Sequence, residues 1–169
     1  QPVHSHPWLG PLDFARLESQ QTGLYHKNSF QIAIDEKIWV ANANGGLAQL
    51  SKEGNIEKKW TTWEGLPHNT VISIDTENEK LIVGTANGAA LIQKDSVTQM
   101  WDKELTHTYV QTVKLNGEDI WLGAYHGLQR IRAGNINHLI DRGSVFALEP
   151  STEGMWVGHK GLTIIDTND

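Results

Sequence analysis

The chain consists of short apolar runs separated by polar turns that contain glycine. One phrase occurs four times: a polar residue or glycine, three large apolar residues, then alanine or glycine. Its copies are Lys37–Ala41, Lys80–Gly84, Asp119–Gly123 and Gly154–Gly158. Their central residues, Trp39, Ile82, Trp121 and Trp156, are 43, 39 and 35 residues apart. This spacing is close to the roughly 40–45 residues of one four-stranded propeller blade, so the pattern predicts repeated blades.

Further strands are predicted on both sides of each phrase. A hairpin turn follows it, at Asn44-Gly45, Asn87-Gly88, His126-Gly127 and Lys160-Gly161. Asn-Gly between apolar segments is a strong hairpin signal because both residues tolerate a positive φ. Before the phrase, Val71, Val110 and Val145 each begin a strand 11 residues ahead of its centre, and Gln31–Asp35 aligns with Val71–Asp75 in the first copy. Fourth strands are predicted at Ile56–Trp60, Val97–Trp101 and Ile136–Ile140.

The predicted fold class is therefore all-β, a β-propeller built of about four four-stranded blades. Residues 1–11 are expected to form an N-terminal extension, and residues 12–169 the blades. The last copy supplies three strands, and we expect Phe14–Leu17 to supply a fourth. Three arrangements stay open because propellers have about 4–8 blades: a closed four-bladed ring, a half-ring of a dimer, or part of a larger propeller.

Composition narrows the functional classes. The 169 residues include no cysteine, which excludes disulfides, thiol catalysis and cysteine-bound zinc. The formal net charge of -6 argues against a nucleic-acid partner, because proteins that bind nucleic acids usually present a basic surface. No segment approaches the roughly 20 apolar residues of a membrane helix. The seven tryptophans belong largely to the repeat, and we expect the rings of Trp39, Trp121 and Trp156 to pack between blades.

The repeat resembles the two-component regulator propeller repeat. The residues that carry this resemblance are Gly65-Leu66, Val71–Ile74 and Leu81–Thr85 with Asn87-Gly88, then Trp121–Gly123 with Gly127-Leu128 and Trp156–Gly158 with Gly161-Leu162. The resemblance covers about residues 12–165. Ile82, Ala41 and Ala89-Ala90 depart from the family's tryptophan, glycine and Gly-Leu. The resemblance implies a propeller in the extracytoplasmic sensor region of a bacterial hybrid histidine kinase or diguanylate cyclase, and it brings no catalytic motif.

Seven loop residues are candidate ligand-binding positions. His26, His68 and His107 precede first strands, Arg142 takes the same place in the fourth copy, and Tyr125, His126 and His159 lie at hairpin turns. In a propeller these two kinds of loop fall on one face, so we expect the residues to ring one mouth of the central channel. Imidazoles suit zinc, copper or nickel, so a divalent metal is an alternative, but we expect no cofactor.

The expected function is a non-catalytic ligand-sensing or binding module of a bacterial signal-transduction receptor, in the periplasm or outside the cell. Its expected partner is a small molecule or saccharide, and a homodimer is left open. No nucleic acid and no membrane segment within this chain are expected. Two alternatives remain: a protein-interaction scaffold, and a lyase or hydrolase that uses a histidine cluster at the channel mouth. The sequence shows no Gly-x-Ser-x-Gly, phosphate loop or His-Glu-x-x-His for the enzyme alternative.

Overall fold

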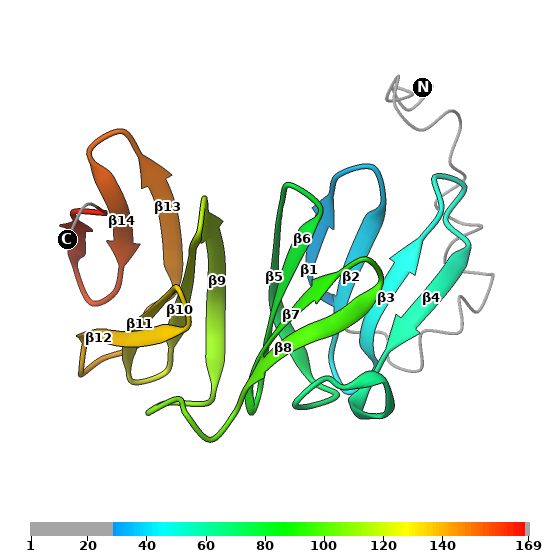
Figure 1. Cartoon of the computed structure of the whole chain (residues 1–169), viewed down its shortest axis with the longest axis horizontal. Coiled ribbons are helices and arrows are strands. Elements are labelled where there is room, and N and C mark those ends of the chain that lie inside the picture. Colours follow the sequence, from blue (N-terminus) through cyan, green and yellow to red (C-terminus); the bar gives the residue numbers. More distant parts are fainter. Residues whose placement is uncertain (1–28, 168–169) are drawn as a thin grey trace, which may run out of the picture.

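The computed structural model describes residues 29–167, which form four antiparallel sheets (Figure 1). The first blade contains β1 (Ser29–Ile34), β2 (Ile38–Asn42), β3 (Gly46–Leu50) and β4 (Ile56–Trp60). The second contains β5 (Val71–Glu77), β6 (Lys80–Thr85), β7 (Gly88–Gln93) and β8 (Ser96–Trp101). The third contains β9 (Val110–Asn116), β10 (Asp119–Ala124), β11 (Gly127–Arg132) and β12 (Asn135–Ile140). The fourth contains β13 (Ala147–Ser151), β14 (Gly154–Gly158) and β15 (Leu162–Ile165). A 3-10 turn, η1 (Thr62–Glu64), joins the first two blades.

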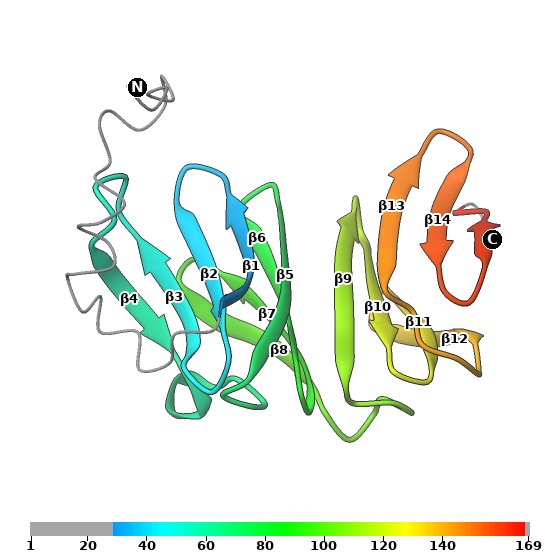
Figure 2. The ribbon, with the colours of Figure 1, turned by 180° about the vertical axis from the view of Figure 1, so that it is seen from behind.

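The strands of each blade pair in sequence order, as the repeat predicts. The first strands of successive blades pack side by side, β1 against β5, β5 against β9 and β9 against β13. Figures 1 and 2 show the first and fourth blades at opposite ends of the molecule, so the blades form an open arc. The closed four-bladed ring is therefore not the arrangement observed. The extension at 1–11 and the strand expected at Phe14–Leu17 lie outside the described residues.

The core lies between the blades, as expected for sheets that cannot bury both faces alone. Trp39 and Trp60 of the first blade pack against Ile74 and Val83 of the second. Trp121 is fully buried where the third blade meets the fourth. The prediction that these mid-strand rings pack between blades is thus confirmed for Trp39 and Trp121. Trp156, in the fourth blade, keeps 36% of its surface exposed.

The pairing of β1 corrects one alignment made from the sequence. Ile32 pairs with Val40 as Ile74 pairs with Val83, so Gln31 corresponds to Ser73 and not to Val71. The pairing also shows a recurring irregularity. One residue at the start of each of β1, β5 and β9 has no partner on the next strand: Phe30, Ile72 and Gln111. Such β-bulges bend a strand and re-aim the side chain of the extra residue.

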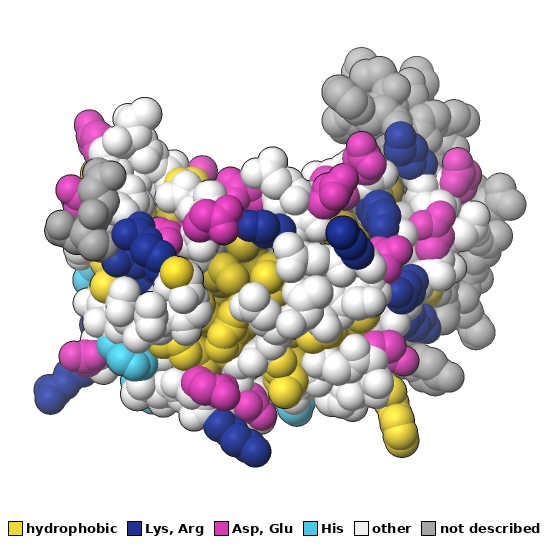
Figure 3. Space-filling model, in the orientation of Figure 1, with side chains coloured by type: hydrophobic (Ala, Val, Ile, Leu, Met, Phe, Trp, Pro, Cys, Tyr) yellow, Lys and Arg dark blue, Asp and Glu magenta, His cyan; other side chains and the backbone are white. Residues whose placement is uncertain are grey.

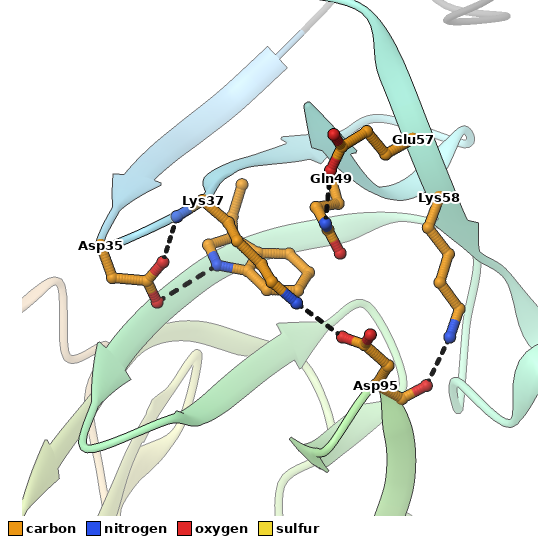
Figure 4. Close-up of polar contacts among 7 residues, drawn as sticks. Asp35, Lys37, Gln49, Glu57, Lys58 and Asp95 are labelled. Carbon is orange, nitrogen blue, oxygen red and sulfur yellow. Dashed lines mark hydrogen bonds and ion pairs between the residues drawn. The ribbon is translucent and has the colours of Figure 1, made fainter. Parts of the chain in front are cut away.

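Polar contacts also tie neighbouring blades together (Figure 4). The ammonium group of Lys37, between β1 and β2, donates to Asp95 Oδ1 at 2.8 Å. Lys58 on β4 donates to the backbone oxygen of Asp95 at 2.6 Å. Asp95 lies in the turn between β7 and β8. This one residue of the second blade therefore accepts hydrogen bonds from two separate segments of the first blade. Acidic and basic side chains are interspersed on the face drawn in Figure 3, with hydrophobic side chains near its middle.

Within residues 29–167, no helix is long and apolar enough to cross a membrane.

Candidate functional site

The candidate site lies where the loop that leads into β9 meets the turn between β10 and β11. The backbone N–H of Tyr125 in this turn donates to the carbonyl oxygen of Tyr109 at 3.1 Å. On the other side, the Ser144 hydroxyl donates to the Tyr125 carbonyl oxygen at 2.8 Å, and Val145 N–H donates to Ala124 O at 3.0 Å. The turn is therefore held between the loop before β9 and the segment before β13.

Four aromatic rings line up across this junction. The imidazoles of His107 and His126 have ring centroids 5.4 Å apart. The phenol ring of Tyr125 meets His126 edge-on at 4.7 Å and Tyr109 edge-on at 6.4 Å. Edge-to-face contacts at these distances are favourable ring geometry. Both tyrosines are nonetheless about half exposed, so the row presents aromatic surface to solvent.

A cavity of about 560 Å³ opens beside these rings. It is lined by Thr106, His107, Thr108, Tyr109, Gln111, Tyr125 and His126. Its volume is within the roughly 300–1,000 Å³ of small-molecule sites. Gln111 Oε1 is buried and has no hydrogen-bond partner among the described residues. A buried acceptor left unpaired costs about 1–3 kcal/mol, so a turn of the Gln111 amide that let Oε1 accept from a bound ligand would recover this free energy.

The buried side-chain amide of Gln129 holds the backbone of the loop before β9. Gln129 Oε1 on β11 accepts from Thr106 N–H at 3.0 Å, and Gln129 Nε2 donates to His107 O at 3.4 Å. Burial lowers the pKa of His107, and the neighbouring His126 and His138 lower it further. The His107 imidazole is therefore neutral at pH 7, with one nitrogen that donates and one that accepts.

The structure does not gather all of the predicted site residues. It brings together His107, Tyr125 and His126. His68 instead accepts a hydrogen bond from Thr70 N–H at Nδ1 (2.9 Å), which closes its own loop. His159 lies 2.8 Å from the Thr163 hydroxyl in the fourth blade. Arg142 is exposed and is not among the residues that line the cavity, and His26 lies outside the described residues.

Sequence reasoning missed Thr106, Thr108, Tyr109 and Gln111. A comparison of the third copy with the second would have found two of them. Tyr109 stands where the second blade has Thr70, and Gln111 stands where it has Ile72, counting back from the paired strands. Tyr125 and His126 likewise replace Ala86 and Asn87. The fold does not require these side chains, since the second blade forms the same turns without them.

The histidines of the described residues do not form a metal cluster. Among residues 29–167, no group of three or more His, Asp or Glu side chains is placed to hold a metal ion. Two imidazoles, one amide oxygen and two phenol rings can instead hydrogen-bond to hydroxyl groups and pack against a sugar or an aromatic ring.

Comparisons with known proteins bear on the fold. No family model matches the sequence, and no curated protein matches it. Several solved structures do match the fold of this chain. The extracellular domain of BT4673, a proposed hybrid two component system from B. thetaiotaomicron, is 20% identical with a TM-score of 0.69 over 83% of this chain and 23% of its own. The corresponding domain of BT3049 is 18% identical, with a TM-score of 0.64 over 82% of this chain and 23% of its own. Virginiamycin B lyase from Staphylococcus aureus is 17% identical, with a TM-score of 0.65 over 83% of this chain and 53% of its own.

The chain has the β-propeller fold. The repeat's resemblance to two-component sensor propellers has its structural counterpart in the BT4673 and BT3049 domains, which share this fold. The propeller arc spans less than a quarter of those two domains and about half of the lyase. At these identities the likeness concerns the fold alone and assigns no role to the residues around Gln111.

Proposed function

We propose that this propeller is a ligand-binding module of an extracytoplasmic bacterial sensor, placed in the periplasm or outside the cell. The proposed ligand is a small neutral polar molecule such as a saccharide, bound in the cavity beside Tyr125. The observation that carries the proposal is a cavity edged by aromatic rings and lined by Gln111, whose buried Oε1 has no hydrogen-bond partner among the described residues. The likeness to extracellular domains of two hybrid systems supports the setting.

The lining suits a saccharide better than a charged ligand. The exposed faces of Tyr109 and Tyr125 offer flat apolar surface for the C–H face of a pyranose ring. Gln111 Oε1 would accept a hydrogen bond from a hydroxyl group. The neutral His107 would donate or accept a further one. No Lys, Arg, Asp or Glu side chain lines the cavity, so an ionic ligand would lose hydration there without gaining a counter-charge.

Binding at this place would affect the joint between the third and fourth blades. The Tyr125–His126 turn bonds both to the loop before β9 and to Ser144 before β13. A ligand held against Tyr125 would favour one relative position of these two segments. It would transmit a signal only if it bound that arrangement better than the alternative.

Calorimetric titration with neutral monosaccharides and disaccharides tests the proposal. The expected result is saturable binding of at least one sugar, weakened about tenfold or more by Tyr125→Ala or by Gln111→Leu, which corresponds to about 1.4 kcal/mol or more. Asn87→Ala is the matched control, because Asn87 occupies the turn position of His126 in the second blade. This control should bind as the unmodified chain does. Absence of binding across the panel, or equal loss in the Asn87 variant, would contradict the proposal.

A further inference from the structure

One position of the repeat is buried in three blades and open in the first. Ile74, Val113 and Leu148 point toward the preceding blade and are 1%, 5% and 7% exposed. Ile32 holds the same place in β1, since it pairs with Val40 as Ile74 pairs with Val83. Ile32 is 59% exposed. The difference between these positions is the presence of a blade in front of the last three.

On the opposite face of each blade, the equivalent position is buried in the first three blades and partly exposed in the fourth. Trp39, Ile82 and Trp121 point toward the following blade and are 5%, 0% and 0% exposed. Trp156 holds the same place in the fourth blade and is 36% exposed. Its paired neighbour Ile164 is exposed as well. Thus the arc buries the tryptophan position wherever another blade follows.

Residues 29–167 therefore carry two unpaired halves of one kind of interface. The near face consists of Phe30, Ile32 and Ile34 on β1, all more than half exposed. The far face consists of Trp156, Leu162 and Ile164 on β14 and β15. Inside the chain, each of the three blade junctions joins a surface of the near type to one of the far type. Exposed apolar surfaces of this kind mark sites of association.

A polar contact at the second junction has counterparts of its two positions on the open faces. At the second junction, Asp75 Oδ2 accepts from Leu115 N–H of the next blade at 2.8 Å. The position of Asp75 is held in the fourth blade by Glu149, whose side chain is 76% exposed and lies 4.0 Å from Lys114 Nζ. The position of Leu115 is held in the first blade by Ile34. A far face docked on a near face would thus bring a carboxylate to the backbone of β1.

We propose that two copies of this chain join head to tail, the far face of each against the near face of the other. The occupant is a second copy because the same chain presents both halves of the junction. Two arcs of four blades would close a ring of eight, at the upper end of the usual range of about 4–8 blades. Closure in a two-fold pair covers both faces of both copies, whereas an open chain of copies would leave one of each exposed. This proposal does not depend on the ligand site.

Light scattering of the unmodified chain tests the stoichiometry. The expected mass is twice the 18.9 kDa of one chain, over a wide range of concentration. A single-chain mass at all concentrations would overturn the proposal. A series of masses that grows with concentration would overturn closure at two copies.

Charged substitutions test the surfaces. Ile34→Glu on the near face and Leu162→Lys on the far face should each yield a single-chain mass where the unmodified chain is a dimer. Both side chains are about two-thirds exposed, so the variants should keep the β circular dichroism spectrum. Trp63→Glu is the control, because Trp63 is 92% exposed and lies outside both faces; its mass should stay that of the dimer. If Ile34→Glu and Leu162→Lys also remain dimeric, the faces are wrongly assigned.

Mixing the two variants distinguishes the head-to-tail arrangement. A pair of Ile34→Glu with Leu162→Lys has one unmodified junction and one junction with opposite charges. The mixture should therefore regain the dimer mass that each variant loses alone. A near-to-near pairing would not be rescued in this way, since no junction of a near-to-near pair contains a far face. Failure of the mixture to regain the dimer mass would overturn the arrangement.

Discussion

The carboxylate of Asp75 bridges two blades, because its Oδ2 accepts a 2.8 Å hydrogen bond from the backbone N–H of Leu115. Its Oδ1 lies 3.3 Å from the ammonium nitrogen of Lys114. The first strands of neighbouring blades belong to separate sheets and share no ladder of hydrogen bonds. Asp75 therefore provides a directional contact where hydrophobic packing alone would not set how far one blade slides along the next.

Asp75→Ala should lower the free energy of unfolding by about 1.5–3 kcal/mol, the usual value for a hydrogen bond to a charged group. The loss arises because the Leu115 N–H is left without its acceptor. Urea unfolding at one fixed protein concentration measures it. Glu118→Ala removes an exposed partner of Lys80 and should cost at most about 1 kcal/mol. Equal losses in the two variants would contradict the assigned role of Asp75.

Trp60 and Trp63, three residues apart, should respond very differently to truncation. Trp60 is 1% exposed and its ring centroid lies 5.3 Å from that of Trp39 between the first two blades. Trp60→Ala should cost about 3–5 kcal/mol because it opens a cavity in that core. Trp63 is 92% exposed, so Trp63→Ala should stay within about 0.5 kcal/mol. Thermal unfolding of the two variants checks this, and a large loss for Trp63→Ala would be inconsistent with the structure.

The strands of the blades could be predicted from the sequence because each blade repeats the same apolar run followed by a glycine turn. An apolar run that centres on Trp39 or Trp121 must lie in a sheet covered on both faces, and the glycine turns after it set the hairpin. The register of β1 was wrong because its turn differs in length from those of the other copies, so counting residues misplaced Gln31 by two. The openness of the arc could not be read from the repeat, since spacing along the chain does not define the angle between sheets.

The site was predicted in part for the same reason. Loops that recur in every copy are expected on one face, and the rings of His107 and His126 lie 5.4 Å apart. Whether a loop histidine reaches a cavity depends on its own hydrogen bonds, and His68 bonds to Thr70 within its loop instead. Gln111 was missed because it is the extra residue of a β-bulge, and alternation along a strand does not predict bulges or the direction of their side chains.

Stability should depend on pH through His107. The folded state holds the pKa of His107 below its usual 6.5, because burial disfavours the charged form and His126 and His138 repel it. As pH falls through 6.5, the unfolded chain takes up a proton that the folded chain does not. This contribution to the free energy of unfolding is therefore lost progressively from pH 6.5 down to the lowered pKa of the folded state.

His107→Asn should remove this part of the pH dependence, so the variant should lose less stability than the unmodified chain between about pH 7.5 and 5.5. Proton NMR of the His107 ring measures the titration directly, and its midpoint should lie below 6.5. A midpoint at or above 6.5 would show that the ring is not held in its neutral form.

Gly127 should tolerate no side chain, whereas Gly134 should tolerate one at moderate cost. Both have positive φ, +139° and +80°, where an L-residue is strained by roughly 1–2 kcal/mol. A Cβ at Gly134 meets nothing within 4 Å, so Gly134→Ala should cost only that strain. A Cβ at Gly127 would collide with the backbone oxygen of Ile140 on β12.

The collision in Gly127→Ala forces β11 and β12 apart, and overpacking of this kind typically adds about 1–3 kcal/mol. The total loss should be about 2–5 kcal/mol. The same substitution should also weaken sugar binding, since Gly127 directly follows the Tyr125–His126 turn that edges the cavity. Urea unfolding and calorimetry of the two alanine variants measure both effects. Gly134→Ala should bind as the unmodified chain does, so a loss of binding there would mean that the turn at His126 is not what positions the ligand.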